Sequence, residues 1–493
     1  MTITPEIKKS DILNITNLSV KNAVECKLSI LEEEIPSIVY TSARGSLNSV
    51  ECLNGEIRYS GKAVFYLMLY SGGLKKCEAG VEFSYKQDLK EISEGDCFCG
   101  DIAVENVKVT VNNGIPTISA MIVLSGTAYK KSAVEYLKDV PELNVKKCQA
   151  ESITLTACES KDFDLEDEFS LDFSVNDVVW HDETVCAKSV TSGIGSVSIE
   201  GEAEVKALVL LDDGKTEYIQ RVIPFNFEKE LKSVMPDSIC TAKVSVTDSN
   251  LKVIVDSNKG KSSVQVSIKV CARTCAYENE PITYIADAYS EDCFITVEKT
   301  PVTLRKSLGE SVIQKKIESK GAIKFEKNTL LVCPLFAKIE ESEVEQTSDK
   351  VIVKGLVRFG VLVNTDGAYS VETALLPFDI TVDDRCAISI LRSEVACFKA
   401  SIDGDGLNVE FTVSIAVEKS QSKTFGFGVA VSCGRERKKS TSAISVYIPN
   451  AGDTLWDIAK NLGMKEEDVL KTNSNLQFPL TGEERVVIYR EIN

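Results

Sequence analysis

The feature that most constrains this chain is a β-hairpin pattern that occurs three times. The copies run from Gly55 to Leu89, from Gly195 to Leu231 and from Asp349 to Asp384. In each copy, alternating apolar residues lead to a glycine, a turn follows at nearly equal spacing, and a second run reaches a phenylalanine. The glycines are Gly61, Gly201 and Gly355, and the phenylalanines are Phe83, Phe225 and Phe378. We interpret the pattern as one supersecondary unit in triplicate.

The sequence around the hairpins predicts a mainly β protein. Alternating apolar and polar residues precede and follow each hairpin, and Asn, Asp and Gly turns separate the runs. Short strands with frequent turns are typical of a β-sandwich or a partly open barrel. We therefore expect three tandem β-sandwich or barrel-like units, at 1–150, 151–305 and 306–433, that contact one another in series like beads or a short solenoid. A short helix is expected from Pro5 to Leu13.

The charge of the chain argues against two classes of partner. The 493 residues include 56 Lys and Arg against 74 Asp and Glu, which gives a net charge of −18. Nucleic-acid binders and proteins that adsorb to anionic lipid usually carry a basic face, so neither activity is expected. The sequence has no secretion-signal pattern and no apolar run of the roughly 20 residues that a membrane span needs, so we expect a cytoplasmic protein without a transmembrane segment.

Sixteen cysteines are present, and they are expected to be reduced. The chain is long and lacks a leader or dense CxxC pairs, so a disulfide framework is not favoured. Cys97-Phe98-Cys99 is a single CxC motif, and Cys271 and Cys275 form a single CxxxC motif. Either could hold a metal ion with ligands from elsewhere, but the favoured interpretation is small apolar residues on strands.

Catalytic chemistry is poorly represented in the sequence. His181 is the single histidine, and we expect a structural or surface role for it. No phosphate-binding glycine motif is present, and no cofactor, metal site or catalytic residue is predicted. Acidic residues are numerous enough to include a glycosidase pair, although no catalytic domain can be recognised. The chain is therefore expected not to be an enzyme.

The composition changes after residue 433. Residues 434–443 are polar and basic, and they are expected to form a linker. Residues 444–493 predict a separate small βααβ fold, whose first helix is capped by Asp453 or Thr454 and ends at Gly463. The predicted elements are strands at 446–448 and 486–489 and helices at 456–462 and 465–472.

This C-terminal segment resembles a LysM domain. The resemblance is carried by Tyr447, the run Gly452-Asp453-Thr454-Leu455-Trp456-Asp457-Ile458-Ala459, and then Leu470, Asn473, Leu476, Thr481-Gly482 and the final strand. LysM domains typically bind N-acetylglucosamine polymers in a groove between two loops. The resemblance implies that the groove residues are Gly452, Asp453, Thr454 and Leu455, facing Asn473, Ser474, Asn475 and Leu476. Trp456 joins this set as a candidate anchor for a protein partner.

The whole chain resembles the SipL-like family of spore-coat morphogenetic proteins, in which repeated SPOCS domains precede a LysM domain. The triplicated hairpin and a connector with Tyr284 and Asp287-Ala288-Tyr289 carry this resemblance. It implies a non-enzymatic protein in the mother-cell cytoplasm, at the forespore surface. There it would bind other coat proteins and, through its LysM domain, the coat-basement ATPase called stage IV sporulation protein A. The alternative is a LysM protein of the cell or spore envelope that binds peptidoglycan or other N-acetylglucosamine polymers.

Overall fold

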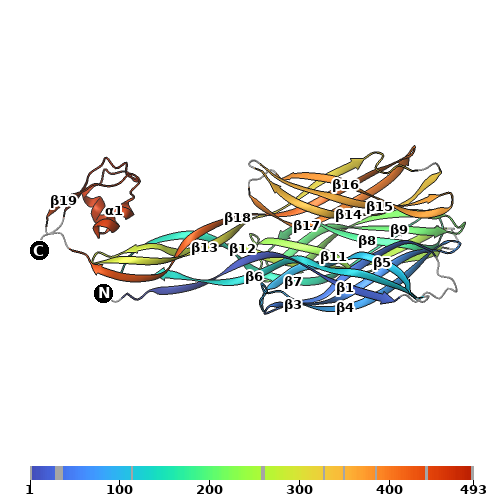
Figure 1. Ribbon diagram of the computed structural model, residues 1–493, viewed down its shortest axis with the longest axis horizontal. Helices are drawn as coiled ribbons and strands as arrows, with labels where there is room; N and C mark the ends of the chain where they lie inside the picture. Colours follow the sequence, from blue (N-terminus) through green and yellow to red (C-terminus); the bar gives the residue numbers. More distant parts are fainter. Residues whose placement is uncertain are drawn as a thin grey trace.

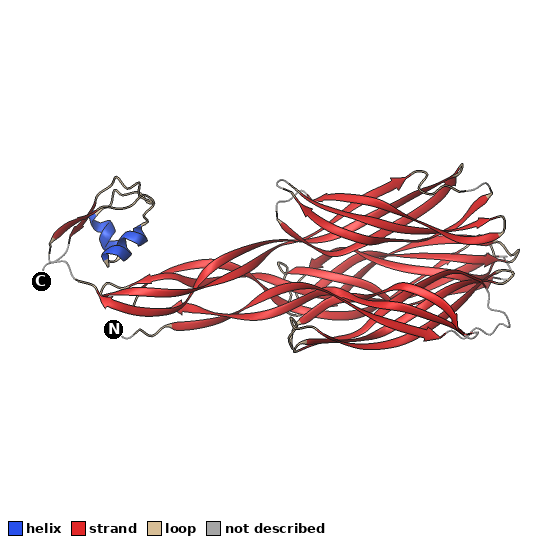
Figure 2. Ribbon diagram, viewed as in Figure 1, coloured by secondary structure: helices blue, strands red, loops and turns tan. Residues whose placement is uncertain are grey.

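The computed structural model confirms a mainly β protein, in which 79% of the described residues lie in strands and 3% in helices (Figure 2). It describes residues 3–27, 37–112, 115–256, 261–325, 328–347, 350–382, 386–438 and 442–489. Asp349 and Asp384, the expected ends of the third hairpin, lie outside these ranges, as do residues 439–441 of the expected linker.

All three expected hairpins are present. They are β3 (Glu56–Tyr70) with β4 (Leu74–Asp88), β9 (Ser196–Leu211) with β10 (Thr216–Glu230), and β15 (Val351–Thr365) with β16 (Ala368–Val382). One further antiparallel strand precedes each hairpin: β2 (Ser37–Leu53), β8 (Val175–Ser192) and β14 (Thr329–Gln346). Each repeat thus contains a three-stranded meander.

A second three-stranded sheet accompanies each meander. The strand orders are β1 (Glu6–Lys27), β6 (Ile115–Asp139), β5 (Cys97–Asn112); β11 (Ile239–Asp256), β12 (Lys261–Tyr289), β7 (Asn144–Ser170); and β13 (Cys293–Ser319), β18 (Gly406–Glu436), β17 (Ala387–Asp403). In each repeat both sheets contribute to one apolar core, so each repeat is a two-layer sandwich. We call β1–β6, β7–β12 and β13–β18 units 1, 2 and 3.

The unit limits and strand lengths differ from the expectation. Positions 150 and 305, where boundaries are expected, fall inside β7 and β13, and β18 continues past residue 433. The strands are also long, and register shifts interrupt several of them. These bulges let a long strand bend and twist without breaking its ladder. Each bulge interrupts the alternation of apolar and polar residues, so the sequence pattern predicts several short strands in place of one long strand.

The repeated glycine and phenylalanine of each hairpin face each other across the ladder. Gly201 pairs directly with Phe225, and a side chain at Gly201 would meet the ring of Phe225 and the carbonyl oxygen of Cys186. The other two copies show the same arrangement, with Gly61 opposite Phe83 and Gly355 opposite Phe378. The glycine is therefore required for close approach within the sheet, and the phenylalanine covers it.

The three units form a closed ring rather than a series of beads. The last strand of each meander contacts the first strand of the next, so β4 contacts β8, β10 contacts β14 and β16 contacts β2. Equivalent residues Met68, Leu208 and Leu362 consequently meet in one buried cluster. The expected serial contact is wrong because the central strands β3, β9 and β15 are apolar on both faces. One face fills the sandwich of its own unit, and the other faces the interior of the ring.

A stalk extends from the ring (Figure 1). The edge strands β5, β11 and β17 stop pairing at Tyr129, Tyr277 and Ser420, beyond which each unit continues as a two-stranded ribbon. The three ribbons pack together around aromatic rings: Tyr284 stacks on Phe427 at 4.1 Å between centroids, and Tyr136 meets Phe427 edge-on at 5.3 Å. The pseudo-threefold arrangement of the ring thus continues along the stalk.

Two expectations fail in the stalk. The segment from Pro5 to Leu13 is not a helix, because its residues pair with β6 as part of β1. Cys293 and Cys433 form a disulfide across β13 and β18, with their Cα atoms 6.3 Å apart, although reduced cysteines were expected. Neighbouring antiparallel strands bring Cα atoms within the range that a disulfide requires, even when the cysteines are far apart in sequence.

The C-terminal module, residues 442–489, lies at the far end of the stalk (Figure 1). Its element order is the expected one: β19 (Ile444–Tyr447), α1 (Leu455–Leu462), α2 (Glu466–Thr472) and β20 (Val486–Tyr489). Its small core includes Ile458, Val469 and Val486, and Tyr289 of β12 completes this core from outside. No helix in the described part of the chain is long and apolar enough to cross a membrane.

Candidate functional site

The first of the two expected groove loops leads into α1. Gly452 is exposed and has φ +92°, a conformation that favours glycine. Its N–H donates to the Leu480 carbonyl at 2.7 Å, and the Leu480 N–H donates to the Asp453 carbonyl at 2.9 Å. These bonds fasten the loop to the segment before β20.

Thr454 is the N-cap of α1. Its side chain accepts a hydrogen bond from the Asp457 N–H, and its own N–H donates to the Asp457 carboxylate at 3.0 Å. The Thr454 hydroxyl also donates to this carboxylate at 2.6 Å, and together with the bond from the Thr454 N–H it lowers the pKa of Asp457 despite partial burial. Asp453 accepts from the Asn450 N–H at 2.8 Å, and Gly463 ends the helix in the left-handed conformation at φ +64°. The capping chemistry is therefore a capping box at Thr454.

Asn473, in the second expected loop, is buried and fully hydrogen-bonded. Its Nδ2 donates to the carbonyls of Val469 at 2.8 Å and Val487 at 2.7 Å, and its Oδ1 accepts from the Val487 N–H at 2.8 Å. The side chain therefore ties α2 to β20. Ser474 and Asn475 are exposed, whereas Leu476 and the equally half-buried Leu455 pack against the same module core.

Trp456 points toward unit 2 and away from solvent. Its Nε1 donates to the Asp287 carboxylate at 3.0 Å, and its ring meets Tyr289 edge-on at 4.9 Å. Lys460 donates to both oxygens of Asp287 at 2.6 and 2.7 Å, and the Tyr289 hydroxyl donates to the Met464 carbonyl at 2.8 Å. We call this set the docking contact, because it fixes the module on the connector at the end of β12.

Burial opposes ionisation of Asp287, but the hydrogen bonds from Lys460 and Trp456 outweigh it and lower the pKa of this carboxyl.

Arg437, in the expected linker, strengthens the same junction. Its guanidinium donates to the carbonyls of Lys460 at 2.7 Å and Asn461 at 3.1 Å and lies 4.4 Å from the Phe294 ring centroid. A cation at a helix C-terminus is favourable, so this part of the linker is an ordered contact.

One face of the β19–β20 sheet is apolar and exposed. Ile444 and Tyr489 are directly paired, and each is 58% exposed, while Val446 is 56% exposed and Ile448, the residue that follows β19, is 64% exposed. Paired residues project from the same face of a sheet, and alternate residues along a strand do so as well. Val486, which belongs to the module core, and Ile488 are buried on the opposite face. We call Ile444, Val446, Ile448 and Tyr489 the outer face.

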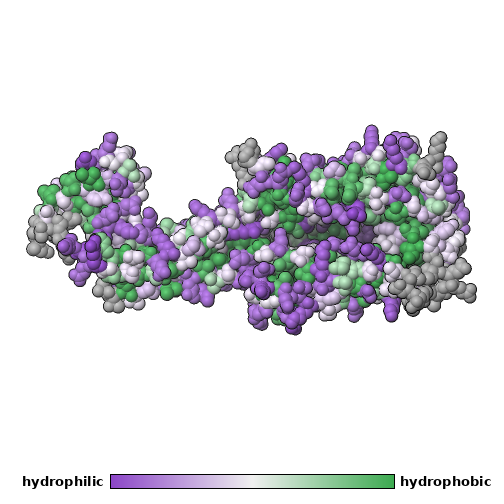
Figure 3. All heavy atoms as spheres, viewed as in Figure 1, coloured by the Kyte–Doolittle hydropathy of each residue, from purple (hydrophilic) through white to green (hydrophobic). Residues whose placement is uncertain are grey.

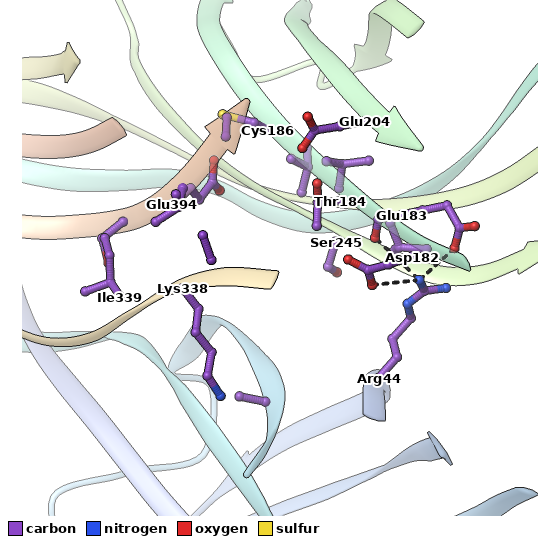
Figure 4. Close-up of a pocket in the computed structure, with 18 of the residues that line it drawn as sticks. Arg44, Asp182, Glu183, Thr184, Cys186, Glu204, Ser245, Lys338, Ile339 and Glu394 are labelled. Carbon is purple, nitrogen blue, oxygen red and sulfur yellow. Dashed lines mark hydrogen bonds and ion pairs between the residues drawn. The ribbon is translucent and has the colours of Figure 1, made fainter. Parts of the chain in front are cut away.

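A cavity of about 1080 Å³ lies where the three units meet, and all three contribute to its walls. Figure 4 shows Arg44 reaching from β2 toward Asp182 and Glu183 on β8, with Lys338 and Glu394 across the space. Lys338 and Arg44 occupy equivalent positions in the repeats. Burial raises the pKa of Glu394, so this carboxyl retains its proton more readily than an exposed one.

His181 belongs to a buried network beside this cavity. Its Nδ1 donates to Glu183 at 2.7 Å, and its Nε2 accepts from the Lys76 ammonium of unit 1 at 2.8 Å. Burial disfavours the Glu183 anion, but bonds from His181 and Ser249 and the Arg44 charge lower its pKa to about 2. Both ring nitrogens of His181 are thus occupied, and the network links units 1 and 2 structurally.

Sequence analysis did not identify the cavity, the outer face or the docking contact. Among the described residues, no group of three or more His, Cys, Asp or Glu side chains is arranged to hold a metal ion. The connector Asp287-Ala288-Tyr289 was noticeable as a motif, but no sequence signal indicated that it receives Trp456. Alternation at Ile444, Val446 and Ile448 was the available signal for the outer face.

Similarity to other proteins does not indicate a function for these surfaces. Comparison of the chain with known protein families, known proteins and solved structures finds no match. The outer face, the docking contact and the cavity are therefore interpreted from their own geometry.

Proposed function

We propose that the chain is a non-enzymatic assembly protein whose C-terminal module binds a partner protein. The observation that carries this proposal is the outer face, where four large apolar side chains are more than half exposed at the end of the stalk. Hydrophobic spheres are visible on this part of the surface in Figure 3. Clustered exposed apolar residues, with an aromatic among them, are typical of protein-binding surfaces.

The family resemblance gives this proposal a specific form. The SipL-like spore-coat morphogenetic proteins act on the mother-cell side of the forespore surface. In our proposal, the C-terminal module is a LysM domain that binds a coat-basement ATPase of the stage IV sporulation protein A type. The three SPOCS-like units form the ring and the stalk, and the stalk holds the module away from the ring. The position of the module at the stalk end supports this division of labour.

Sugar binding is the second candidate, because Gly452, Ser474 and Asn475 are exposed. Two of the expected groove residues are committed elsewhere, however. Asn473 uses its amide within the module, so it is not free to contact a glycan. Trp456, the expected anchor for a protein partner, packs against Asp287 and is not free for either kind of ligand. The buried amide of Asn473 and the exposed outer face together favour a protein partner over an N-acetylglucosamine polymer.

The test measures binding of the full chain to a purified ATPase of this type, using Ile444→Asp/Val446→Asp as the variant. We expect affinity to fall at least about tenfold, since two apolar contacts would be replaced by charges that must be desolvated. Ile194→Asp is the matched control, because Ile194 is 85% exposed on unit 2, and binding should be retained.

Titration with N-acetylglucosamine oligomers distinguishes the second candidate. If the wild-type chain binds the oligomers and Asn475→Ala abolishes this binding, while the outer-face variant has no effect on either ligand, the proposal is wrong. Circular dichroism of each variant shows whether the module remains folded.

A further inference from the structure

Four cysteines from units 1 and 2 meet at the base of the stalk. Cys97 and Cys99 lie at the start of β5, Cys158 lies on β7 and Cys275 lies on β12, and all four belong to one cluster with Tyr129 and Tyr277. Cys158 and Cys275 are directly opposed in the antiparallel ladder, and their Sγ atoms are 2.8 Å apart. We call these four residues the thiol cluster.

At this separation the two cysteines are thiols in contact, placed so that a sulfur–sulfur bond of about 2.05 Å can form with little movement. Directly opposed residues on antiparallel strands have Cα atoms within the range of a disulfide. Two thiolates of a tetrahedral zinc site, each about 2.3 Å from the metal, would lie about 3.8 Å apart. The pair is therefore too close for shared metal ligation and is suited to a sulfur–sulfur bond.

The surroundings favour an ionised Cys158. The Cys275 and Cys97 thiols each donate a hydrogen bond to its sulfur, and together with the charge of Lys229 they lower the pKa of Cys158 well below its usual range, although burial opposes this. Lys229 is 2% exposed, and its Nζ has no hydrogen-bond partner among the described residues. Its nearest anion, Glu159, is 3.8 Å away and largely exposed.

We propose that Cys158 and Cys275 form a dithiol site that hydroperoxides oxidise to a disulfide. Cys158, which is half-buried, is the attacking thiolate, and Cys275, which is fully buried, is the resolving thiol. Cys97 and Lys229 are positioning residues that stabilise the thiolate. The site lies between units 1 and 2, close to the contact in which Arg273 donates to the Leu47 carbonyl at 2.7 Å.

The reaction balances without a cofactor. The Cys158 thiolate attacks one peroxide oxygen, an S–O bond forms as the O–O bond breaks, and the departing hydroxide takes a proton from solvent to become water. The Cys275 sulfur then attacks the Cys158 sulfur, the S–S bond forms, and the S–O oxygen leaves as water with the Cys275 proton. Two thiols and one hydrogen peroxide give one disulfide and two waters, and an organic hydroperoxide would give one water and one alcohol.

The experiment treats the reduced full chain with hydrogen peroxide, blocks remaining thiols with N-ethylmaleimide and maps linked peptides by mass spectrometry without reduction. We expect a Cys158–Cys275 link, and expect Lys229→Met to slow its formation about tenfold, because loss of the charge returns the thiol toward its ordinary pKa. Cys271→Ser is the matched control: Cys271 is buried on the same strand as Cys275, and the link should form at the wild-type rate.

Two further measurements test the roles proposed for Cys158 and Cys275. In Cys275→Ser, dimedone should label Cys158, since the sulfenic acid can no longer be resolved. In the wild type, iodoacetamide at pH 6 should alkylate Cys158 before any other cysteine. The proposal is overturned if Cys158 and Cys275 stay separately alkylated after peroxide treatment, or if the purified chain holds stoichiometric zinc that protects all four thiols.

Discussion

The three units of the ring and the C-terminal module differ in where their apolar side chains point. In the ring, Met68, Leu208 and Leu362 are almost fully buried against one another. In the module, Ile444 and Val446 are more than half exposed, although they lie on a strand in the same way. The repeats use their additional apolar face on each other, whereas the single module has no repeat partner to cover its face. This difference teaches that repetition supplies a partner for each additional apolar face, whereas the unrepeated module keeps an uncovered one.

The largest effect is expected from a side chain at the hairpin glycine. Gly201→Val places a Cβ against the Cys186 carbonyl oxygen, which cannot move without disturbing the ladder, and against the Phe225 ring, which would have to leave its position over the glycine. We expect a loss of more than about 4 kcal/mol in the free energy of unfolding, measured by denaturant titration. Gly73→Ala is the control, because a side chain there meets open space, and it should change stability little.

A core truncation tests whether the ring behaves as one body. Leu208→Ala removes a fully buried side chain of unit 2 and should cost about 2–5 kcal/mol. Because Leu208 packs with Met68 and Leu362, hydrogen exchange should accelerate in units 1 and 3 as well. Acceleration confined to unit 2 would mean that the units are energetically separate beads. Leu330→Ala, at a position 69% exposed, serves as the control.

The docking contact should weaken when its central carboxylate is removed. Asp287→Ala deprives Trp456 and Lys460 of their shared acceptor and should cost about 1–3 kcal/mol of docking free energy. The chain has two tryptophans, so Trp180→Phe leaves Trp456 as the only tryptophan, and excitation at a wavelength that tyrosine does not absorb reports on it alone. In that background, Asp287→Ala should shift the emission to longer wavelength and Glu280→Gln, on the exposed surface of β12, should not. An unchanged spectrum would show that docking does not depend on Asp287.

The smallest expected effect is the pH dependence of the same contact. The folded-state pKa of Asp287 is lowered below its ordinary value of 3.8. The contribution of Asp287 to the docking free energy is therefore fully present above about pH 4, and it disappears as the pH falls through the folded-state pKa. Emission from Trp456 in Trp180→Phe should therefore stay constant from pH 7 to pH 4 and shift only below that. A shift between pH 5 and pH 7 would contradict this assignment.

The hairpins and the C-terminal elements could be predicted because their signals are local. A glycine, a turn and a phenylalanine at fixed spacing specify one hairpin, and Thr454 and Gly463 mark the two ends of α1. These signals depend on residues within a few positions of one another, so they are visible in the sequence without any knowledge of the tertiary structure.

The ring, the stalk and the thiol cluster depend on contacts between distant residues and could not be predicted. The segment at Pro5–Leu13 has a helix-like pattern, yet its long-range pairing with β6 decides its conformation. Cys97 and Cys158 are ordinary strand cysteines in sequence, and only the junction of units 1 and 2 brings them together. For the candidate site, the motif led us to expect Trp456 as an anchor for a protein partner. The structure places it against Asp287 of β12 instead, a contact that the sequence did not indicate.

The contact of β16 with β2 has a consequence for how many repeats such a chain can contain. An open solenoid can gain or lose a repeat at either end, because each repeat needs only its neighbours. Here the third unit returns to the first, so a fourth copy would have to break this contact before it could enter. Deletion of one copy would leave two units with unmatched apolar edges. The architecture therefore fixes the copy number at three. A chain with a duplicated unit would fold less well, so such a duplication would be selected against.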